Sequence, residues 1–260
     1  MTNALNWLLL RGLAREARHW GDFPKILESR LPGTQTFCVD LPGAGTEHER
    51  MPSPSVESIM EDTRARFLEA KRPGRWAILG QSLGGMVAML WAQRYPEDFE
   101  RVAVLNTSAA NVAGPHHRFG LGALPGGLRS LAARDLETRE SFIFDITCTD
   151  TTKRTETVAS WVQYARERPV RRRALMRQLL AASRFMAPER LDVPILVLAS
   201  SKDKVASPIC SMRLAQRLEA PLHVHPTAGH DLGHDVPHWV ADRIGEWIQQ
   251  GELSEHPAVA

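Results

Sequence analysis

The chain has 260 residues, 43% of them hydrophobic, which is enough to bury a substantial core in one decorated domain. Its 32 basic and 30 acidic residues give a formal net charge of +2, so the overall charge predicts no attraction to nucleic acid or to anionic membranes. The three cysteines lie far apart and form no C-x-x-C pair, which argues against a disulfide framework and favours a reducing compartment.

The first apolar run, Trp7 to Leu10, opens the series of predicted strands. It is far shorter than the roughly 7 to 15 residues of a signal-peptide core or the roughly 20 residues of a membrane span. We therefore expect no export signal, no membrane anchor and a cytoplasmic location.

Short apolar runs alternate with longer amphipathic segments along the chain. The apolar character of the runs is continuous, which is typical of strands buried on both faces. These predicted strands are Trp7–Leu10, Thr36–Asp40, Trp76–Leu79, Val102–Leu105, Ile195–Leu198 and Leu222–His225. The amphipathic segments predict helices at Glu16–Ser29, Val56–Lys71, Gly84–Tyr95, Ile209–Leu218 and Trp239–Gln250. This alternation predicts the α/β class, with a mostly parallel sheet flanked by helices on both faces.

The alternation breaks once, where helical stretches replace strands at Ser141–Ile146, Thr157–Arg166 and Arg171–Phe185. We interpret residues 114–190 as a helical cap inserted into a core made of residues 1–113 and 191–260. The insertion holds 14 Lys and Arg against 8 Asp and Glu. Such an excess is common on solvated helical surfaces, and the alternative is a lid that attracts anionic substrates.

The strongest local motif is Gly80-Gln-Ser82-Leu-Gly84, which follows a predicted strand and precedes a predicted helix. A G-x-S-x-G turn in this setting projects the serine hydroxyl away from the sheet, and its glycines allow close backbone approach. The start of the helix favours the negative charge that develops when serine attacks a carbonyl. Ser82 is therefore the candidate nucleophile.

A serine hydroxyl needs a neighbouring base, and His230 is the best-placed histidine. It lies between the last predicted strand and the final helix, on a loop at the carboxyl end of the sheet. His234 and His238 continue its four-residue spacing, which on a helix would form a metal site. Gly233 and Pro237 argue against that helix, so no metal is expected.

The base needs a carboxylate that orients it, and Asp203 follows the strand Ile195–Leu198 at the expected place. It also falls between Ser82 and His230 in the order serine, acid, histidine. The competing carboxylates are Asp40, Asp145, Asp231 and Asp235, of which Asp231 is too close to His230 in sequence to orient it well.

An oxyanion formed at the substrate carbonyl needs two N–H donors. The residue after the nucleophile, Leu83, supplies one candidate. The loop after the first strand, Arg11-Gly12-Leu13, supplies the other, and Leu13 is its candidate donor.

Taken in order, these motifs resemble the α/β-hydrolase superfamily, in its esterase-like branch with a helical cap. The resemblance covers nearly the whole chain and rests on Leu8–Gly12, Asp40–Gly43, Gly80–Gly85, Pro194–Asp203 and Ala228–His230 with Pro237. Relatives usually carry His-Gly where this chain has Arg11-Gly12, so Arg11 is expected to bring a buried positive charge near the pocket. Because the first strand begins near residue 7, no preceding hairpin is expected and the sheet should have about six strands.

The resemblance implies hydrolysis of a small carboxylic ester or thioester through an acyl-enzyme, without a cofactor. Acyl transfer and cleavage of an amide or lactone use the same residues. An inactive ligand- or partner-binding protein, favoured only by Arg11, and a metal site at the histidine cluster remain as alternatives. The cap residues expected to shape an apolar acyl pocket are Phe142, Phe144, Trp161, Met176 and Phe185. The sequence indicates no oligomeric state.

Overall fold

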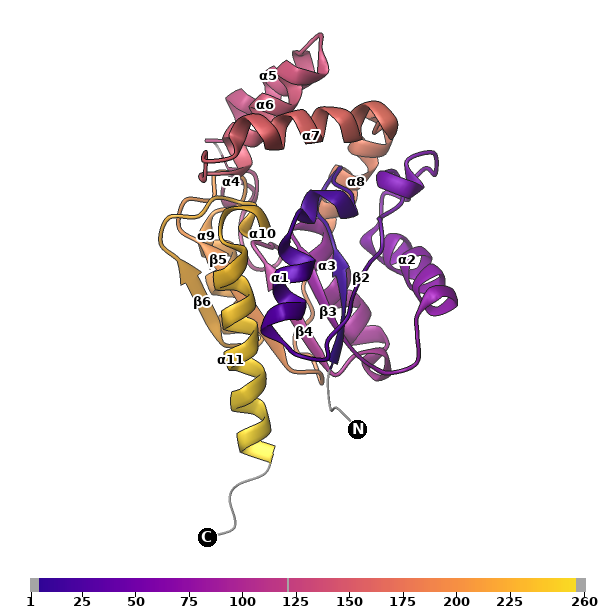
Figure 1. The fold of residues 1–260 in the computed structure, drawn as a ribbon, viewed down its shortest axis with the longest axis vertical. Coiled ribbons are helices and arrows are strands. Elements are labelled where there is room, and N and C mark those ends of the chain that lie inside the picture. Colours follow the sequence, from indigo (N-terminus) through magenta and orange to yellow (C-terminus); the bar gives the residue numbers. More distant parts are fainter. Residues whose placement is uncertain (1–4, 121, 256–260) are drawn as a thin grey trace.

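The computed structural model describes residues 5–120 and 122–255, and it places six parallel strands in one sheet (Figure 1). The sheet order is β2-β1-β3-β4-β5-β6. The strands are β1 (Leu5–Leu10), β2 (Thr36–Cys38), β3 (Arg75–Gln81), β4 (Arg101–Leu105), β5 (Ile195–Ser200) and β6 (Leu222–His225). The predicted class and the predicted number of strands are confirmed.

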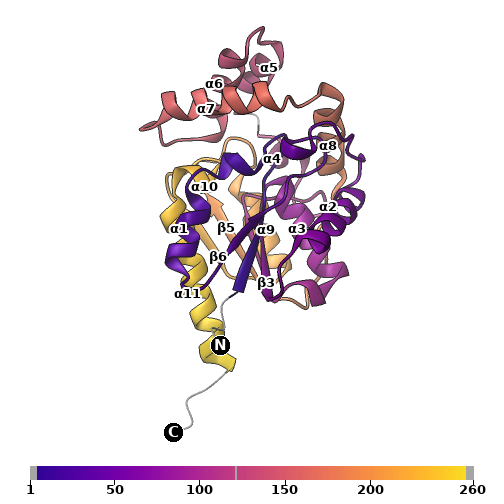
Figure 2. The same cartoon turned by 45° about the vertical axis from the view of Figure 1, so that its right-hand side comes forward.

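Helices cover both faces of the sheet (Figure 2). One face packs against α1 (Phe23–Arg30) and α11 (Pro237–Glu255). The other packs against α2 (Val56–Ala70), α3 (Leu83–Arg94) and α9 (Pro208–Arg217). Strand β1 shows why its apolar run is continuous. Trp7 and Leu9 pack on the face covered by α1 and α11, whereas Leu8 and Leu10 pack on the opposite face.

The prediction of one continuous helix over Glu16–Ser29 is wrong. The structure divides it into η1 (Ala17–Trp20), a short 3-10 helix, and α1. Gly21 ends η1 with a φ of 54°, a conformation that glycine adopts without a steric penalty. Pro24 then lies in the first turn of α1, where its missing N–H costs no helical hydrogen bond.

In the part of the chain that the structure describes, five helices lie between β4 and β5, and we call them the cap helices. They are α4 (Pro115–Arg118), α5 (Leu124–Ala132), α6 (Leu136–Thr147), α7 (Arg154–Glu167) and α8 (Arg172–Arg184). In Figures 1 and 2, α5, α6 and α7 lie together above one end of the sheet. Phe144, Cys148, Val158 and Trp161 form a small hydrophobic cluster of their own there.

The order of the strands places a crevice at one end of the sheet. The chain winds outward from β1 to β2 and then returns to β3 on the other side of β1. Ligands of open α/β sheets bind beyond the carboxyl ends of strands at such a reversal. The segments that leave these ends are Arg11-Gly12 after β1 and Ser82 after β3. Over the described part of the chain, no helix has the length and apolarity needed to span a bilayer.

Candidate active site

Ser82 stands at a strained turn between β3 and α3. Its backbone φ is 53° and its ψ is −116°, a combination that non-glycine residues rarely adopt. A Cβ on Gly80 would lie 2.2 Å from the carbonyl oxygen of Gly84, and a Cβ on Gly84 would lie 2.3 Å from that of Leu10. The hydroxyl of Thr107 donates to the Ser82 carbonyl at 2.6 Å. The glycines therefore permit the sharp turn, and Thr107 holds it.

His230 and Asp203 are joined by a hydrogen bond of 2.7 Å between imidazole Nδ1 and carboxylate Oδ2. The Asp203 side chain is fully buried, and its other oxygen accepts the N–H groups of Val205 at 2.7 Å and Ala206 at 2.9 Å. Burial of the His230 ring opposes its charged form. The charge of Asp203 and the hydrogen bond to it outweigh that effect, so the pKa of His230 is raised above its ordinary value.

Two residues that the sequence did not single out hold the loop of His230. The side-chain amide of Asn106, which follows β4, donates to the His230 carbonyl at 2.9 Å. Gln81, immediately before the candidate nucleophile, donates to the same carbonyl at 3.2 Å. Both lie at the carboxyl end of a buried strand, and that location was the available sequence signal.

The competing carboxylates are engaged elsewhere. Asp40 accepts the N–H groups of Ala17 at 2.6 Å and Thr46 at 2.8 Å, which holds two loops together. Asp145 pairs with a cap arginine at the surface. Asp231 pairs with Arg11, and Asp235 binds backbone N–H groups. Within residues 5–120 and 122–255, Asp203 is thus the acid that contacts the His230 ring.

Arg11 is buried, as expected, and connects the end of β1 to three other parts of the site. Its guanidinium donates to Asp231 at 2.5 and 3.0 Å and to Gln81 at 3.1 Å, and lies 4.6 Å from the centre of the Trp20 ring. Burial alone would raise the pKa of Asp231, but the charge and hydrogen bonds of Arg11 outweigh burial and lower it to about 2. Asp231 is the neighbour of His230, and Gln81 is the neighbour of Ser82.

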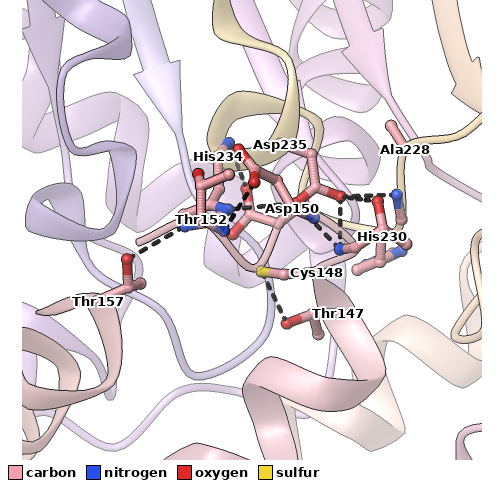
Figure 3. Close-up of polar contacts among 12 residues, drawn as sticks. Thr147, Cys148, Asp150, Thr152, Thr157, Ala228, His230, His234 and Asp235 are labelled. Carbon is pink, nitrogen blue, oxygen red and sulfur yellow. Dashed lines mark hydrogen bonds and ion pairs between the residues drawn. The ribbon is translucent and has the colours of Figure 1, made fainter. Parts of the chain in front are cut away.

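A second polar cluster lies where the segment that joins α6 to α7 meets the loop of His230 (Figure 3). Cys148, His234 and Asp235 each place a potential metal-ligating atom within 4.8 Å of the others. Burial raises the pKa of the Cys148 thiol well above its ordinary value, which opposes the thiolate that a metal requires. His238 is exposed on α11, and the break between α10 (Leu232–Asp235) and α11 prevents the aligned histidines of a helical metal site.

The carboxylate of Asp235 has a structural use in this cluster. It accepts the N–H groups of Gly229 at 2.7 Å, Thr149 at 2.9 Å and Asp150 at 3.1 Å. The Asp231 N–H also donates to the Thr147 carbonyl at 2.8 Å. These contacts fasten the loop of His230 to the segment that joins α6 to α7.

Ser82 and His230 line one cavity of about 520 Å³, between the end of the sheet and the cap helices. This volume suits a small-molecule ligand. Among the described residues, the His230 ring bonds to Asp203, and no hydrogen bond joins it to the Ser82 hydroxyl.

Leu13 and Leu83, the candidate oxyanion donors, line the same cavity. In the described part of the chain, neither backbone N–H donates to a protein acceptor. A Cβ on Gly12 would lie 3.1 Å from the Ser82 Cβ, so the Gly12 loop is packed against the candidate nucleophile. Both donors are therefore available at the cavity wall.

The wall of the cavity differs from the expected acyl pocket. Phe144 and Trp161 form the small core of the cap, and Phe185 joins the main core beneath it. Of the five predicted residues, only Met176 lines the cavity. The apolar wall is built instead by aliphatic residues that include Met86, Leu128, Leu131, Ile143 and Leu175. Helical spacing predicts that these apolar side chains share a buried face, but it does not determine what that face packs against.

Comparisons with known proteins identify the family and the fold. The sequence profile of the family described as serine aminopeptidase S33 (Hydrolase_4) matches residues 8–237. The solved structure of 2-hydroxy-6-oxo-6-phenylhexa-2,4-dienoate hydrolase from Rhodococcus sp. strain RHA1 superposes with a TM-score of 0.74. It is 21% identical and covers 95% of this chain and 90% of its own.

Two curated relatives match over shorter regions. The pimeloyl-[acyl-carrier protein] methyl ester esterase of Chromobacterium violaceum is 33% identical over 90 residues, which are 35% of this chain and 33% of that protein. A homoserine O-acetyltransferase of Haloferax prahovense is 34% identical over 116 residues, which are 38% of this chain and 28% of that protein. Each match thus spans about a third or less of the relative's length.

Proposed function

Because the chain belongs to the serine aminopeptidase S33 family and has the α/β-hydrolase fold, we propose that it hydrolyses a carboxylic ester or thioester through an acyl-enzyme. The observation that carries the proposal is the 2.7 Å bond between His230 and a fully buried Asp203, on a cavity that Ser82 also lines. No cofactor is needed for this chemistry.

In the proposed acylation step, the Ser82 oxygen attacks the substrate carbonyl carbon while His230 Nε2 takes the hydroxyl proton. The N–H groups of Leu13 and Leu83 donate to the resulting oxyanion. The tetrahedral intermediate collapses, the bond to the alcohol or thiol breaks, and His230 returns the proton to that leaving group. Ser82 is left as an acyl ester.

In the proposed deacylation step, water attacks the acyl carbon and gives its proton to His230. Collapse releases the carboxylic acid, and the proton returns to Ser82. Asp203 stays ionised throughout, accepts from Nδ1 and stabilises the imidazolium of each step. The raised pKa of His230 fits this role, since it reports stabilisation of the charged ring.

Acyl transfer is the second candidate, because one curated relative is an acetyltransferase and the acyl-enzyme is common to both reactions. The match to a methyl ester esterase favours hydrolysis. The two differ only in whether water or another nucleophile accepts the acyl group. Product analysis with and without added alcohols separates them.

A fluorophosphonate probe tests the mechanism directly. We expect the wild-type protein to be labelled, labelling to persist after chelator treatment, and Ser82→Ala to abolish it. Retained fold without labelling of the wild type would overturn the enzyme assignment and favour a binding protein. Loss of labelling on chelation would point to a metal site.

A further inference from the structure

The walls of the candidate active-site cavity carry more cations than anions. Six arginines and three carboxylates line it. The arginines are Arg11, Arg15, Arg118, Arg139, Arg168 and Arg172, and the acids are Glu16, Glu140 and Asp231. The one other histidine on the wall, His19, adds no charge, since burial and then Arg15 hold its pKa well below the ordinary value.

Only one of the three acids is matched to a single arginine. Asp231 pairs with Arg11 beneath the site. Glu140 is shared by Arg15 at 2.8 Å and Arg139 at 2.9 Å. The cap side of the cavity therefore keeps an excess of positive charge around Glu140.

The charges around Glu16 are matched and add no excess. Glu16 contacts Arg18 and lies 3.7 Å from Arg168, and Glu167 also pairs with Arg18. Arg172, at the start of α8, is exposed and has no acidic partner in the described part of the chain. The cavity therefore has cations that its own carboxylates do not neutralise.

Arg15 is the cation with the clearest capacity for a ligand. Its Nη1 contacts Glu140 at 2.8 Å and His19 at 2.9 Å, and its guanidinium lies 4.3 Å from the centre of the Trp161 ring. Its Nη2 is buried and has no hydrogen-bond partner among the described residues. Leaving a buried donor of a charged group unsatisfied is costly, so a ligand acceptor that reached this nitrogen after a small shift of the side chain would bind favourably.

Arg118 has a different role from Arg15. It donates to the carbonyls of Ala182 at 2.6 Å and Ser183 at 2.7 Å, in the last turn of α8. Cations at a helix carboxyl end are stabilised by its unpaired carbonyls. We therefore assign Arg118 to holding α8 and not to the ligand.

We propose that the cavity takes a substrate with an anionic group, a carboxylate or a phosphate, and that Arg15 is its principal donor, supported by Arg139 and Arg172. This inference rests on the proposed ester or thioester hydrolysis for its substrate class. A guanidinium binds such oxygens with charge-assisted bonds, and the partly enclosed cavity strengthens them relative to open water. Basic helices on open surfaces need no ligand, but these arginines face a concave, partly apolar cavity.

Three matched esters test the proposal and locate the anion. Phenyl butyrate is neutral, monophenyl glutarate carries a carboxylate on the acyl side, and 3-carboxyphenyl butyrate carries one on the leaving group. We expect the wild type to prefer one charged ester in kcat/KM. Arg15→Met, which keeps the apolar stem over Trp161, should lower kcat/KM for that ester by about 10- to 100-fold. Its effect on the neutral ester should be within about twofold.

Two further variants complete the test. Arg172→Met should show a smaller loss with the same selectivity, and Arg173→Met should leave all three rates unchanged, because Arg173 is exposed on α8 and does not line the cavity. Equal use of the three esters by the wild type, or an equal loss on all three in Arg15→Met, would overturn the inference.

Binding measurements separate this inference from the proposed reaction. If no ester is cleaved, the hydrolase proposal fails, and calorimetry with the same esters still tests the cavity. Preferential binding of a charged ester that is lost in Arg15→Met then supports the anion site alone. Binding of the neutral and charged esters with equal affinity contradicts it.

Discussion

The two walls of the cavity are built in different ways. The wall at the end of the sheet consists of strand ends and tight loops, in which Ser82, His230 and Arg11 are held by buried neighbours. The cap wall presents side chains that remain largely accessible, such as Leu128 at 66% and Met176 at 57% exposure. The proposed chemistry therefore lies on the rigid wall, whereas the cap wall has room to adapt to substrates.

The largest expected effect comes from the rigid wall. Ser82→Ala and His230→Ala should each lower turnover of a short p-nitrophenyl ester by about 10³-fold or more, because either change removes a member of the proposed triad. Circular dichroism and thermal unfolding serve as controls for the fold. Normal turnover in either variant would contradict the proposal that the catalytic residues lie on the rigid wall.

The pH dependence of kcat/KM tests the proposed role of His230 as the base. His230 must be neutral to take a proton, so kcat/KM should rise with pH through its raised pKa, above the ordinary histidine value. Asp203→Asn removes the charge that raises this pKa. The acid limb should then move to lower pH, and the plateau should fall by about 10²- to 10⁴-fold. The loss should be large because the other candidate acids are engaged elsewhere.

A pH–rate profile of both proteins checks this prediction. An acid limb that stays in place in Asp203→Asn would mean that another group sets the pKa of the base. Asp203→Glu, which keeps the charge, is the matched control and should move the limb less than the asparagine variant does.

How far the sequence could predict this wall depends on how local each feature is. The strands, the glycines beside Ser82 and the strand-end positions of Asp203 and His230 could be predicted from runs of neighbouring residues and their order. Their roles remain predictions that the experiments above test. The contacts of Asn106 and Gln81 could not be predicted, because they join side chains to a loop more than 120 residues away.

In the cap, the sequence predicted helices but neither where each one begins nor what its apolar side chains contact. Helical stretches were predicted where α6, α7 and α8 lie, and none was named at α4 or α5. The predicted start near Ser141 is wrong, because α6 begins at Leu136, where Asp135 caps it through the N–H of Thr138 at 2.7 Å. Periodicity also could not distinguish the cap core, with Phe144 and Trp161, from the cavity wall. Amphipathic spacing specifies a buried face but not the partner that covers it.

The buried ion pair of the rigid wall predicts a stability effect. Arg11→Met should lower the free energy of unfolding by about 3 to 5 kcal/mol, because it leaves Asp231 buried without its partner. Arg11→Met combined with Asp231→Leu removes both charges and should recover much of the loss. Denaturant unfolding measures both, and equal losses in the single and double variants would contradict the assigned pairing.

The pair should also appear in the acid stability of the wild type. The pKa of Asp231 is about 2 in the folded protein, below the roughly 3.9 of an unfolded chain. Its contribution is therefore fully present above about pH 4 and is lost as the pH falls toward 2. Asp231→Leu with Arg11→Met should flatten this part of the stability curve, and an unchanged curve would count against Asp231 as its source.

The smallest effect on stability is expected from the cap wall. Met176 is exposed and lines the cavity, so Met176→Ala should change the free energy of unfolding by less than about 0.5 kcal/mol. It should still raise KM for a longer acyl ester by a few fold, since the side chain borders the space that such a chain would fill. Trp161→Ala, in the buried cap core, is the contrasting variant and should cost about 3 to 5 kcal/mol if the cap unfolds with the rest. A large stability loss in Met176→Ala, or none in Trp161→Ala, would show that the cap is packed differently from the adaptable wall described above.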